Sequence, residues 1–287
     1  MKVSVVVPCY NVEVFLETCL RTLLAQTLKD CEFIFVDDGS TDATAGILDS
    51  FKERDPRIRV IHQANKGLGG ARNTGIEAAQ GEYVGFLDAD DELSENYFEA
   101  LYTAAESCDA DIAWTNIQRL LLGKVKHKSV DITERRILTE PQEKVGGKSN
   151  RVVDKIYRRT LFDNKSLLFQ EHRFYEDIFF STPILLAAKK VVTVPEATYY
   201  YVYNPNSITK RRQDEKLQKD RYEALLFVRN LLKKEGLKVP RHLRQIRKKN
   251  YSVCGLSVLK VKDCGEYDVV KLFDVIPVCR RRHREIA

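Results

Sequence analysis

The stretch GEYVGFLDADDEL, residues 81–93, joins an apolar run to a cluster of acidic residues. The run YVGFL at 83–87 has the length and composition of a buried strand. Four acidic residues follow it: Asp88, Asp90, Asp91 and Glu92. Carboxylates this close repel one another and resist leaving water unless a positive group lies beside them. The stretch therefore predicts a strand whose carboxyl end faces an open crevice rather than the core.

Apolar and amphipathic segments alternate through the first 115 residues, which is typical of βαβ units and a mainly parallel sheet. Buried strands are expected at residues 3–8, 32–36, 57–62, 82–87 and 111–120. Helices are expected at residues 12–27, from Ser40 or Thr41 onward, around 71–79 and from Ser94 to 107. The sequence thus predicts an α/β fold with a Rossmann-like central sheet flanked by helices.

Acidic clusters follow two of these predicted strands. Asp37 and Asp38 come directly after the second strand, and Asp88 and Asp90 after the fourth. The carboxyl ends of parallel strands meet at one edge of the sheet, where open α/β sheets bind their ligands. We therefore expect both clusters to face a shared crevice.

The composition is that of a soluble globular protein. The 287 residues are 44% hydrophobic and 31% charged, and no apolar run approaches the roughly 20 residues needed to span a bilayer. The first residues turn polar too soon for a signal peptide. Seven scattered cysteines without a Cys-x-x-Cys pair argue against a disulfide framework or a zinc site. These features predict a cytoplasmic protein with reduced thiols.

The charges are distributed unevenly. Residues 1–118 contain 9 Lys or Arg against 21 Asp or Glu, whereas residues 119–287 contain 38 against 20. Such an asymmetry suggests different partners for the two halves. Residues 119–150 are polar and give no clear pattern, and Gly146-Gly147 predicts a hinge or mobile loop. From residue 213 we expect a basic helical extension.

Two acidic motifs could bind a nucleotide and its cation. Asp88-Ala89-Asp90 could hold Mg²⁺ or Mn²⁺ through oxygen, or could be an acidic surface turn before a helix. The short acceptors of Asp37 and Asp38 suit ribose hydroxyls and base N–H groups, and Gly39 permits a tight turn. Here the alternative is a turn with a helix cap.

Two further motifs have both a functional and a structural interpretation. The glycine-rich residues 63–73 could cradle phosphate at a helix start, or could form a loop with a solvated Arg72. Glu176 and Asp177 could be no more than acids in the first turn of a helix. Aromatic neighbours could also raise the pKa of Asp177 by desolvation, which suits a general base.

Four segments together resemble a known family. VSVVVPCYN at 3–11, VDDGSTD at 36–42, NKGLGGARNTG at 65–75 and FLDADD at 86–91 occur in the order and spacing of the family 2 inverting glycosyltransferases with the GT-A fold. That group assembles sugars of bacterial capsule, O-antigen and teichoic acid. The resemblance covers residues 1–115 closely and continues more loosely through residues 154–158, 174–177 and 199–209.

The resemblance implies a role for each matching position. The nucleotide pocket would be lined by Pro8, Tyr10, Asp38 and Asn65, with Asp37 beside them. Arg72 would contact the nucleotide-sugar, Asp88 its ribose or sugar, and Asp90, together with Asp88, the Mg²⁺ or Mn²⁺. Asp177, next to Glu176, would be the general base. The donor would be a nucleotide-diphosphate sugar, most simply a UDP-sugar, and the acceptor a saccharide or a lipid-linked saccharide.

The resemblance also divides the chain. Residues 1–118 would form the donor half, 119–212 the acceptor and base half, and 213–287 the basic extension. Many relatives carry an Arg where Val202 stands, and Lys210, Arg211 or Arg212 could replace it. With Ser207 these residues could form a flap that orders on the donor, or a solvated basic turn.

The basic C-terminal region leaves several partners open. Its clusters at 241–249 and 280–284 could make peripheral contact with anionic membrane, bind an anionic acceptor or solvate surface faces. Nucleic acid is not expected, because no aromatic residues interleave with them. Two other functions also remain open: a sugar nucleotidyltransferase, although it would need a glycine- and arginine-rich loop after the first strand, and a non-catalytic scaffold. The sequence does not predict the oligomeric state.

Overall fold

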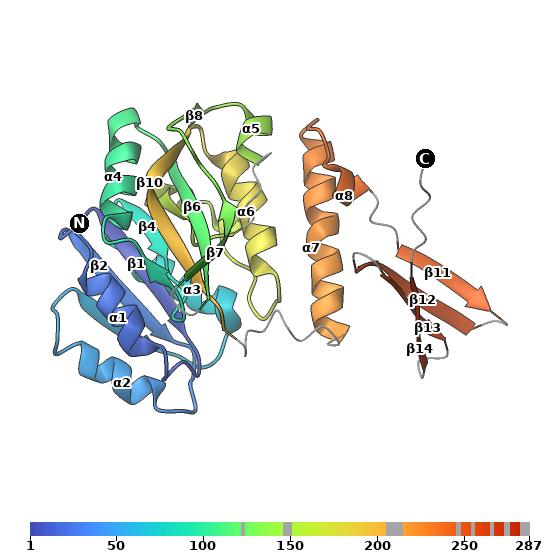
Figure 1. Ribbon diagram of the computed structural model, residues 1–287, viewed down its shortest axis with the longest axis horizontal. Coiled ribbons are helices and arrows are strands. Elements are labelled where there is room, and N and C mark those ends of the chain that lie inside the picture. The colour runs from blue at the N-terminus through green and yellow to red at the C-terminus, as the bar shows by residue number, and fades with distance from the viewer. Residues whose placement is uncertain are drawn as a thin grey trace. The chain divides into compact units, whose positions relative to one another are not determined.

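The computed structural model describes the chain apart from residues 122–123, 146–150, 205–214, 245–247, 254–255, 265–266, 273–275 and 282–287 (Figure 1). From residue 245 onward it describes the backbone alone. The chain divides into two compact units, Met1–Ala224 and Leu225–Ala287.

The first unit is built on a ten-stranded sheet of order β3-β2-β1-β4-β9-β6-β10-β5, with β7 paired to β6 and β8 to β10. The strands are β1 (Val3–Cys9), β2 (Cys31–Asp37), β3 (Ile58–His62), β4 (Tyr83–Phe86), β5 (Glu92–Leu93), β6 (Ile112–Leu121), β7 (Lys124–Val130), β8 (Ile137–Leu138), β9 (Lys155–Arg158) and β10 (Val191–Val202). The first four strands are mutually parallel, as are β6 and β10, and β9 lies antiparallel between the two groups.

Helices cover both faces of this sheet, which confirms the predicted α/β class (Figure 1). They are α1 (Leu16–Leu24), α2 (Thr44–Phe51), α3 (Gly67–Ala78), α4 (Tyr97–Cys108), α5 (Pro141–Val145) and α6 (Glu176–Ala187). A Cβ on Gly75 of α3 would lie 2.2 Å from Val6 of β1, so the backbone of α3 lies directly on the sheet. Gly85, which pairs with the residue before Val6, faces Phe98 of α4, so α3 and α4 lie on opposite faces.

The strand register aligns the carboxyl ends of β1, β2 and β3 at one edge. Cys9 at the end of β1 pairs with Asp37 at the end of β2, which in turn pairs with His62 at the end of β3. On the other side of β1, Val6 pairs with Phe86, the last residue of β4. The acidic residues that follow β2 and β4 therefore emerge at the same edge, as the sequence predicts.

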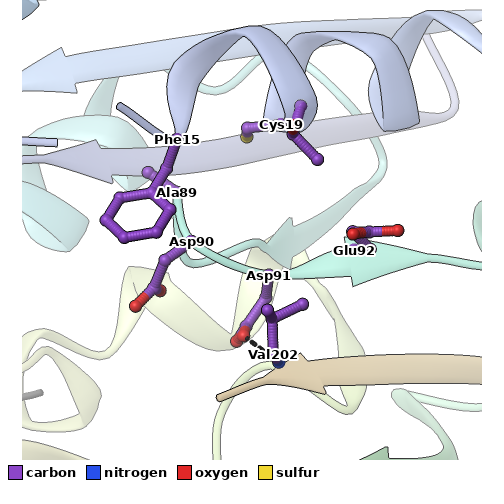
Figure 2. Close-up of a pocket in the computed structure, with 8 residues that line it drawn as sticks. Phe15, Cys19, Ala89, Asp90, Asp91, Glu92 and Val202 are labelled. Atoms are coloured by element: carbon purple, nitrogen blue, oxygen red, sulfur yellow. Dashed lines mark hydrogen bonds between the residues drawn. The ribbon is translucent and has the colours of Figure 1, made fainter. Parts of the chain in front are cut away.

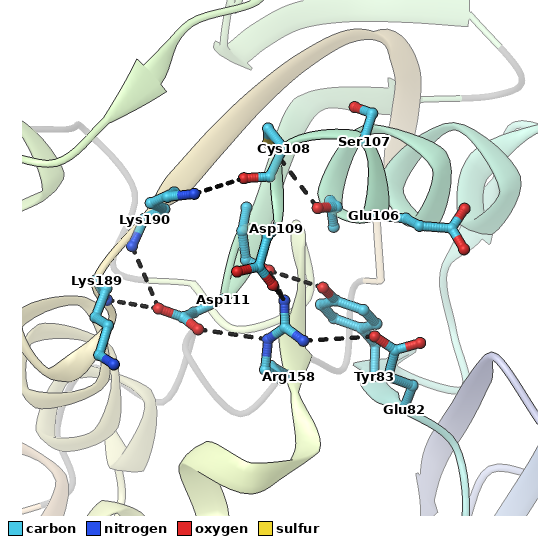
Figure 3. Close-up of polar contacts among 12 residues, drawn as sticks. Glu82, Tyr83, Glu106, Ser107, Cys108, Asp109, Asp111, Arg158, Lys189 and Lys190 are labelled. Atoms are coloured by element: carbon cyan, nitrogen blue, oxygen red, sulfur yellow. Dashed lines mark hydrogen bonds and ion pairs between the residues drawn. The ribbon is translucent and has the colours of Figure 1, made fainter.

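The opposite edge of the sheet is closed by ion pairs around Arg158 (Figure 3). This side chain contacts Glu82 at 3.5 Å, Asp109 at 2.6 Å and Asp111 at 3.4 Å, and its guanidinium lies over the ring of Tyr83. Asp111 also accepts hydrogen bonds from the backbone N–H groups of residues 189 and 190. These contacts join the starts of β4, β6 and β10, so the charge here stabilises the fold.

Residues 119–145 contain more regular structure than their sequence suggests. Strand β7 forms an antiparallel pair with β6, the two-residue β8 pairs with β10, and α5 follows. The two-residue β8 is too short to show a pattern and β7, with the sequence KVKHKSV, is mostly polar, so local patterning gives little signal for them. The predicted hinge at Gly146-Gly147 lies outside the described residues.

The predicted helical extension from residue 213 is only partly correct. Helices α7 (Glu215–Lys234) and α8 (Arg241–Arg244) are present, but four antiparallel strands follow: β11 (Lys248–Val253), β12 (Leu256–Cys264), β13 (Tyr267–Leu272) and β14 (Ile276–Arg281). The β-branched valines in LSVLKVK at 256–262 favour a strand over a helix. In the described part of the chain no helix has both the length and the apolar character to cross a bilayer.

Candidate functional site

Asp38 lies at the centre of the predicted nucleotide pocket. Its Oδ1 accepts hydrogen bonds from Nε2 of Gln63 at 2.6 Å and from the backbone N–H of Lys66 at 2.8 Å. Asn65 donates from Nδ2 to the Asp38 carbonyl oxygen at 2.9 Å. Gly39, at φ +75°, allows this approach, because a Cβ there would lie 3.1 Å from the Asn65 nitrogen. The segments after β2 and β3 are thus locked together at the edge of the sheet.

The contacts of Asp37 stabilise the fold, although this residue is next to Asp38 in the sequence. Its carboxylate accepts from the backbone N–H of Ser40 at 3.0 Å and lies 2.9 Å from Nδ1 of His62. Burial alone would raise the pKa of Asp37, but the hydrogen bonds from Ser40 and His62 outweigh it and lower the pKa. The bond to Asp37 is the main reason that the pKa of His62 is raised. Asp37 therefore stabilises the turn that presents Asp38.

Pro8 and Tyr10 lie at the end of β1 in different environments. Pro8 is buried within the strand, whereas the Tyr10 ring is 51% exposed. Asn11, at φ +53°, accepts from the backbone N–H of Thr41 at 2.8 Å. This bond joins the loop after β1 to the loop after β2 and keeps Tyr10 at the rim of the predicted pocket.

Three acids of the DADD stretch have three different environments. Asp91 is buried, and its carboxylate accepts from the Tyr199 hydroxyl at 2.6 Å. It also accepts from the backbone N–H of Val202 at 2.8 Å (Figure 2). Burial, with the charges of Asp88 and Asp90, raises the pKa of Asp91. Asp91 thus holds the end of β10 against the loop after β4.

Asp90 is the carboxylate most available to a cation. It lines a pocket of about 160 Å³ between this loop and the start of α1, with Phe15 and Cys19 opposite (Figure 2). Asn204 donates from Nδ2 to Oδ2 of Asp90 at 2.8 Å. Burial, opposed by that bond and reinforced by the charge of Asp88, raises the pKa of Asp90. A cation beside Asp90 would relieve this penalty on its charged form.

The carboxylates of Asp88 and Asp90 suit a site where Mg²⁺ or Mn²⁺ is also coordinated by oxygens of a substrate phosphate. In the described residues no three His, Cys, Asp or Glu side chains converge as a closed metal cage. Mg²⁺ at phosphate-transfer sites usually takes one or two protein carboxylates, with phosphate oxygens and water as the other ligands. Asp90 and Asp88 supply such a pair.

Arg72 connects the two acidic regions of the site. The guanidinium is buried and donates from Nη2 to Asp88 at 2.8 Å and from Nη1 to Glu176 at 2.7 Å. Burial alone would lower the pKa of Arg72, but the two carboxylates raise it. Its Nε is buried without a hydrogen-bond partner. Arg72 is therefore not a solvated surface residue, and it holds the first residue of α6 next to the acidic loop.

The glycines of residues 63–73 permit close packing between α3 and the segment before α6. Gly69 lies in the first turn of α3, where a Cβ would be 2.5 Å from the carbonyl oxygen of Gln170. Asn73 exchanges two hydrogen bonds with the backbone of Phe169, both at 2.9 Å. The segment thus occupies the space that a phosphate-binding loop would need for a ligand, which favours the structural interpretation of these glycines.

Asp177 lies in the first turn of α6, where it accepts from the backbone N–H of Ile178 at 2.8 Å. Burial, reinforced by Glu176 and opposed by Arg72, raises the pKa of Asp177 to about 7. The charges of Asp88 and of the buried Lys155 also act on it. A carboxylate with a pKa near 7 is suited to take up a proton at neutral pH.

The structure therefore brings most of the predicted site residues to one edge of the sheet. They are Pro8, Tyr10, Asp37, Asp38, Asn65, Arg72, Asp88, Asp90, Glu176 and Asp177. Ser207 and Lys210–Arg212 lie outside the described residues. The sequence interpretation missed Asp91 and Asn204, whose partners lie more than 100 positions away. The Tyr-rich end of β10 was the available signal, because a buried tyrosine hydroxyl needs an acceptor.

Comparison with known proteins identifies relatives of this chain. The family model described as "Glycosyl transferase family 2" matches residues 4–165. The "Uncharacterized glycosyltransferase EpsJ" of Bacillus subtilis is 41% identical over 237 residues, which is 78% of this chain and 69% of that protein. Glycosyltransferase GlyA of Streptococcus pneumoniae is 33% identical over 86% of this chain, which spans only 37% of GlyA.

The fold is also found among solved structures. Residues 1–349 of Staphylococcus aureus TarS, in complex with UDP-GlcNAc, match with a TM-score of 0.70 and 23% identity. The match covers 85% of this chain and 70% of that one, and it identifies the first unit as a GT-A fold.

Proposed function

The chain belongs to glycosyl transferase family 2, and from that premise we propose that it transfers a sugar from a UDP-sugar to a saccharide or lipid-linked acceptor, with inversion. Membership of this family makes the chain a glycosyltransferase rather than a sugar nucleotidyltransferase or a non-catalytic scaffold. Synthesis of a bacterial surface polysaccharide is the proposed setting.

The donor would bind at the carboxyl edge of β1, β2 and β3. Asp38 and Asn65, which are bonded to each other at this edge, would meet the base and ribose of a nucleotide, and the exposed Tyr10 ring would stack on the base. Support for uridine diphosphate comes from TarS, whose structure holds UDP-GlcNAc, although 23% identity shows the shared fold alone. Donor identity is therefore part of the proposal.

Asp90, with Asp88, would hold Mg²⁺ or Mn²⁺ at the diphosphate. The cation, when bound, neutralises charge on the departing diphosphate. Asp88 would also keep its hydrogen bond to Arg72 of α3, and this bond fixes the position of the Asp88 side chain. Asn204 must move its amide nitrogen away from Asp90, or turn its carbonyl oxygen inward, because an amide donor and a cation compete for the same carboxylate oxygen.

Asp177 would act as the general base. As the acceptor oxygen bonds to the anomeric carbon, the bond from that carbon to the diphosphate oxygen breaks, and the hydroxyl proton passes to the Asp177 carboxylate. The observation that best supports this role is the buried Arg72 bridge, which fixes the start of α6 beside the acidic loop, together with the pKa of Asp177 near 7. Contact between the basic C-terminal region and anionic membrane stays a prediction from the sequence.

The decisive experiment measures UDP release from UDP-glucose, UDP-galactose and UDP-GlcNAc, with water as acceptor, in the presence and absence of MnCl₂. We expect slow release from at least one donor that MnCl₂ stimulates and EDTA abolishes. The control is the Asp90→Ala variant in the same assay. Release from none of the donors, with UDP binding also absent, would contradict the proposal of a UDP-sugar enzyme.

A further inference from the structure

The turn before α6 is held on one side by α7, an element that the family model does not match. Resting on the role proposed above for Asp177, we propose that Asp220 of α7, with its partner Arg173, is a positioning residue for the general base. The contacts that carry this inference all lie within the first unit, Met1–Ala224.

The turn itself has an unusual backbone. His172 and Tyr175 both adopt the left-handed region, at φ +54° and +59°, and neither is a glycine. Tyr175 is the residue directly before α6 and makes no side-chain cap to the helix. Non-glycine residues remain in this region only where the surroundings determine their conformation. The direction in which α6 begins, and hence the position of Asp177, depends on those surroundings.

Asp220 supplies the contact from α7. Its side chain is almost fully buried, and Oδ2 accepts a hydrogen bond from the backbone N–H of Phe174 at 3.0 Å. Oδ1 lies 3.4 Å from Nη1 of Arg173, which also pairs with Glu223 one turn further along α7. The Arg173 guanidinium lies over the ring of Phe179 in α6. One buried carboxylate thus fixes both the backbone and a side chain of the turn.

The opposite side of the turn is held by α3. The backbone N–H of His172 donates to the carbonyl oxygen of Lys66 at 3.2 Å, and Gly67 lies against the same residue. Contacts from α3 and from Asp220 therefore both restrain the turn that contains the two left-handed residues. Removal of the Asp220 carboxylate would release one of these contacts and leave the partly buried N–H group of Phe174 without its acceptor.

The experiment compares Asp220→Ala, Asp220→Asn and Lys233→Ala, the last a control at an exposed position of α7 away from Arg173 and Glu223. UDP release from the best UDP-sugar of the panel is measured against pH, and UDP affinity is measured with MnCl₂ by calorimetry. We expect Asp220→Ala to lower kcat at least tenfold, to move the midpoint of the acidic limb, and to leave UDP affinity within twofold. Asp220→Asn keeps an acceptor oxygen for Phe174 and should recover most of kcat.

Four outcomes separate the possible failures. A folded Asp220→Ala variant with wild-type kcat and an unmoved acidic limb would overturn the inference, as would equal losses in kcat and UDP affinity. If that variant does not fold, Arg173→Ala replaces it, since this half-exposed side chain leaves the Phe174 bond intact. We then expect Arg173→Ala to lower kcat two- to fivefold, and an unchanged kcat would also overturn the inference. If Asp177→Asn keeps normal turnover, the assignment of the base fails irrespective of Asp220.

Discussion

Identical side chains have different chemistry in the DADD stretch because their partners differ. Asp88 pairs with a buried guanidinium, Asp90 lines a pocket, and Asp91 anchors a strand. Neutral donors hold the Asp91 carboxylate, whereas burial raises the pKa of Asp90 beside a pocket that could hold a cation. Spacing within the motif is therefore less informative than the environment of each carboxylate.

Asp90→Ala should abolish the stimulation of UDP binding by Mn²⁺, because the variant removes the most available carboxylate. Calorimetry with UDP, in the presence and absence of MnCl₂, measures this effect. Glu92→Ala is the matched control, since Glu92 lines the same pocket and follows two residues later. Unchanged Mn²⁺-dependent affinity in Asp90→Ala would remove Asp90 from the proposed metal site.

Asp177→Asn should lower kcat by about two orders of magnitude, the usual contribution of a general base. In the wild type, UDP release should rise with pH through about 7 and then level off, because Asp177 must be ionised to accept a proton. Steady-state rates between pH 5 and 9 test both statements. Asp163→Asn, at an exposed position, is the control.

Asp177→Asn should also stabilise the fold at alkaline pH. The folded-state pKa of Asp177 lies above its ordinary value, so its contribution to stability is present at low pH and is lost as pH rises through about 7. At pH 8 the ionised, half-buried carboxylate destabilises the folded state by on the order of 1–3 kcal/mol. Asp177→Asn should raise Tm at pH 8 more than at pH 5. An equal rise in Tm at pH 5 and at pH 8 would contradict this prediction.

At the scale of elements, the contact between α3 and the turn before α6 depends on a glycine. In Gly69→Ala the new Cβ would lie 2.5 Å from a backbone oxygen, so the turn must shift. We expect a loss of stability of about 1–3 kcal/mol and a lower kcat. Gly46→Ala is the matched control, because Gly46 also lies in a helix and its Cβ would meet nothing within 4 Å. Thermal unfolding and UDP release measure both effects.

The elements that the sequence predicts well are those with a strong local pattern. Continuous apolar runs mark β1 and β2, whose seven residues are all buried in each case. The position of β9 between β4 and β6 is not predictable in this way, because its pairing depends on strands far along the chain. The terminal strands β11–β14 were not predicted, because their many basic residues also suit the exposed face of a helix.

A site residue was predictable where a general rule of the fold determines its position. It was not predictable where a long-range contact determines it. Asp38 and Asp90 follow parallel strands, so their shared edge follows from the fold class. The burial of Arg72 depends on Glu176, which lies 104 positions later. No property of the glycine-rich stretch around Arg72 indicates that partner, and the solvated alternative could not be rejected from the sequence alone.

At the scale of the molecule, the whole proposed site lies in the first unit. A chain that ends at Leu237 keeps all of Met1–Ala224 and the full length of α7. We expect this truncated chain to unfold cooperatively and to bind UDP with MnCl₂ within twofold of the full chain. Calorimetry and circular dichroism test this expectation. Loss of cooperative unfolding would show that the first unit needs the C-terminal residues to fold, and loss of UDP affinity alone would show that the proposed donor site needs them.

Asp91 connects the loop after β4 to β10, through the Tyr199 hydroxyl and the Val202 backbone. In a saturation mutagenesis library scored by UDP release, substitutions at Asp90 and at Asp91 would therefore lose activity to a similar degree. The two positions would separate in a second screen of cellular abundance, where Asp91 variants are degraded and Asp90 variants accumulate as inactive protein.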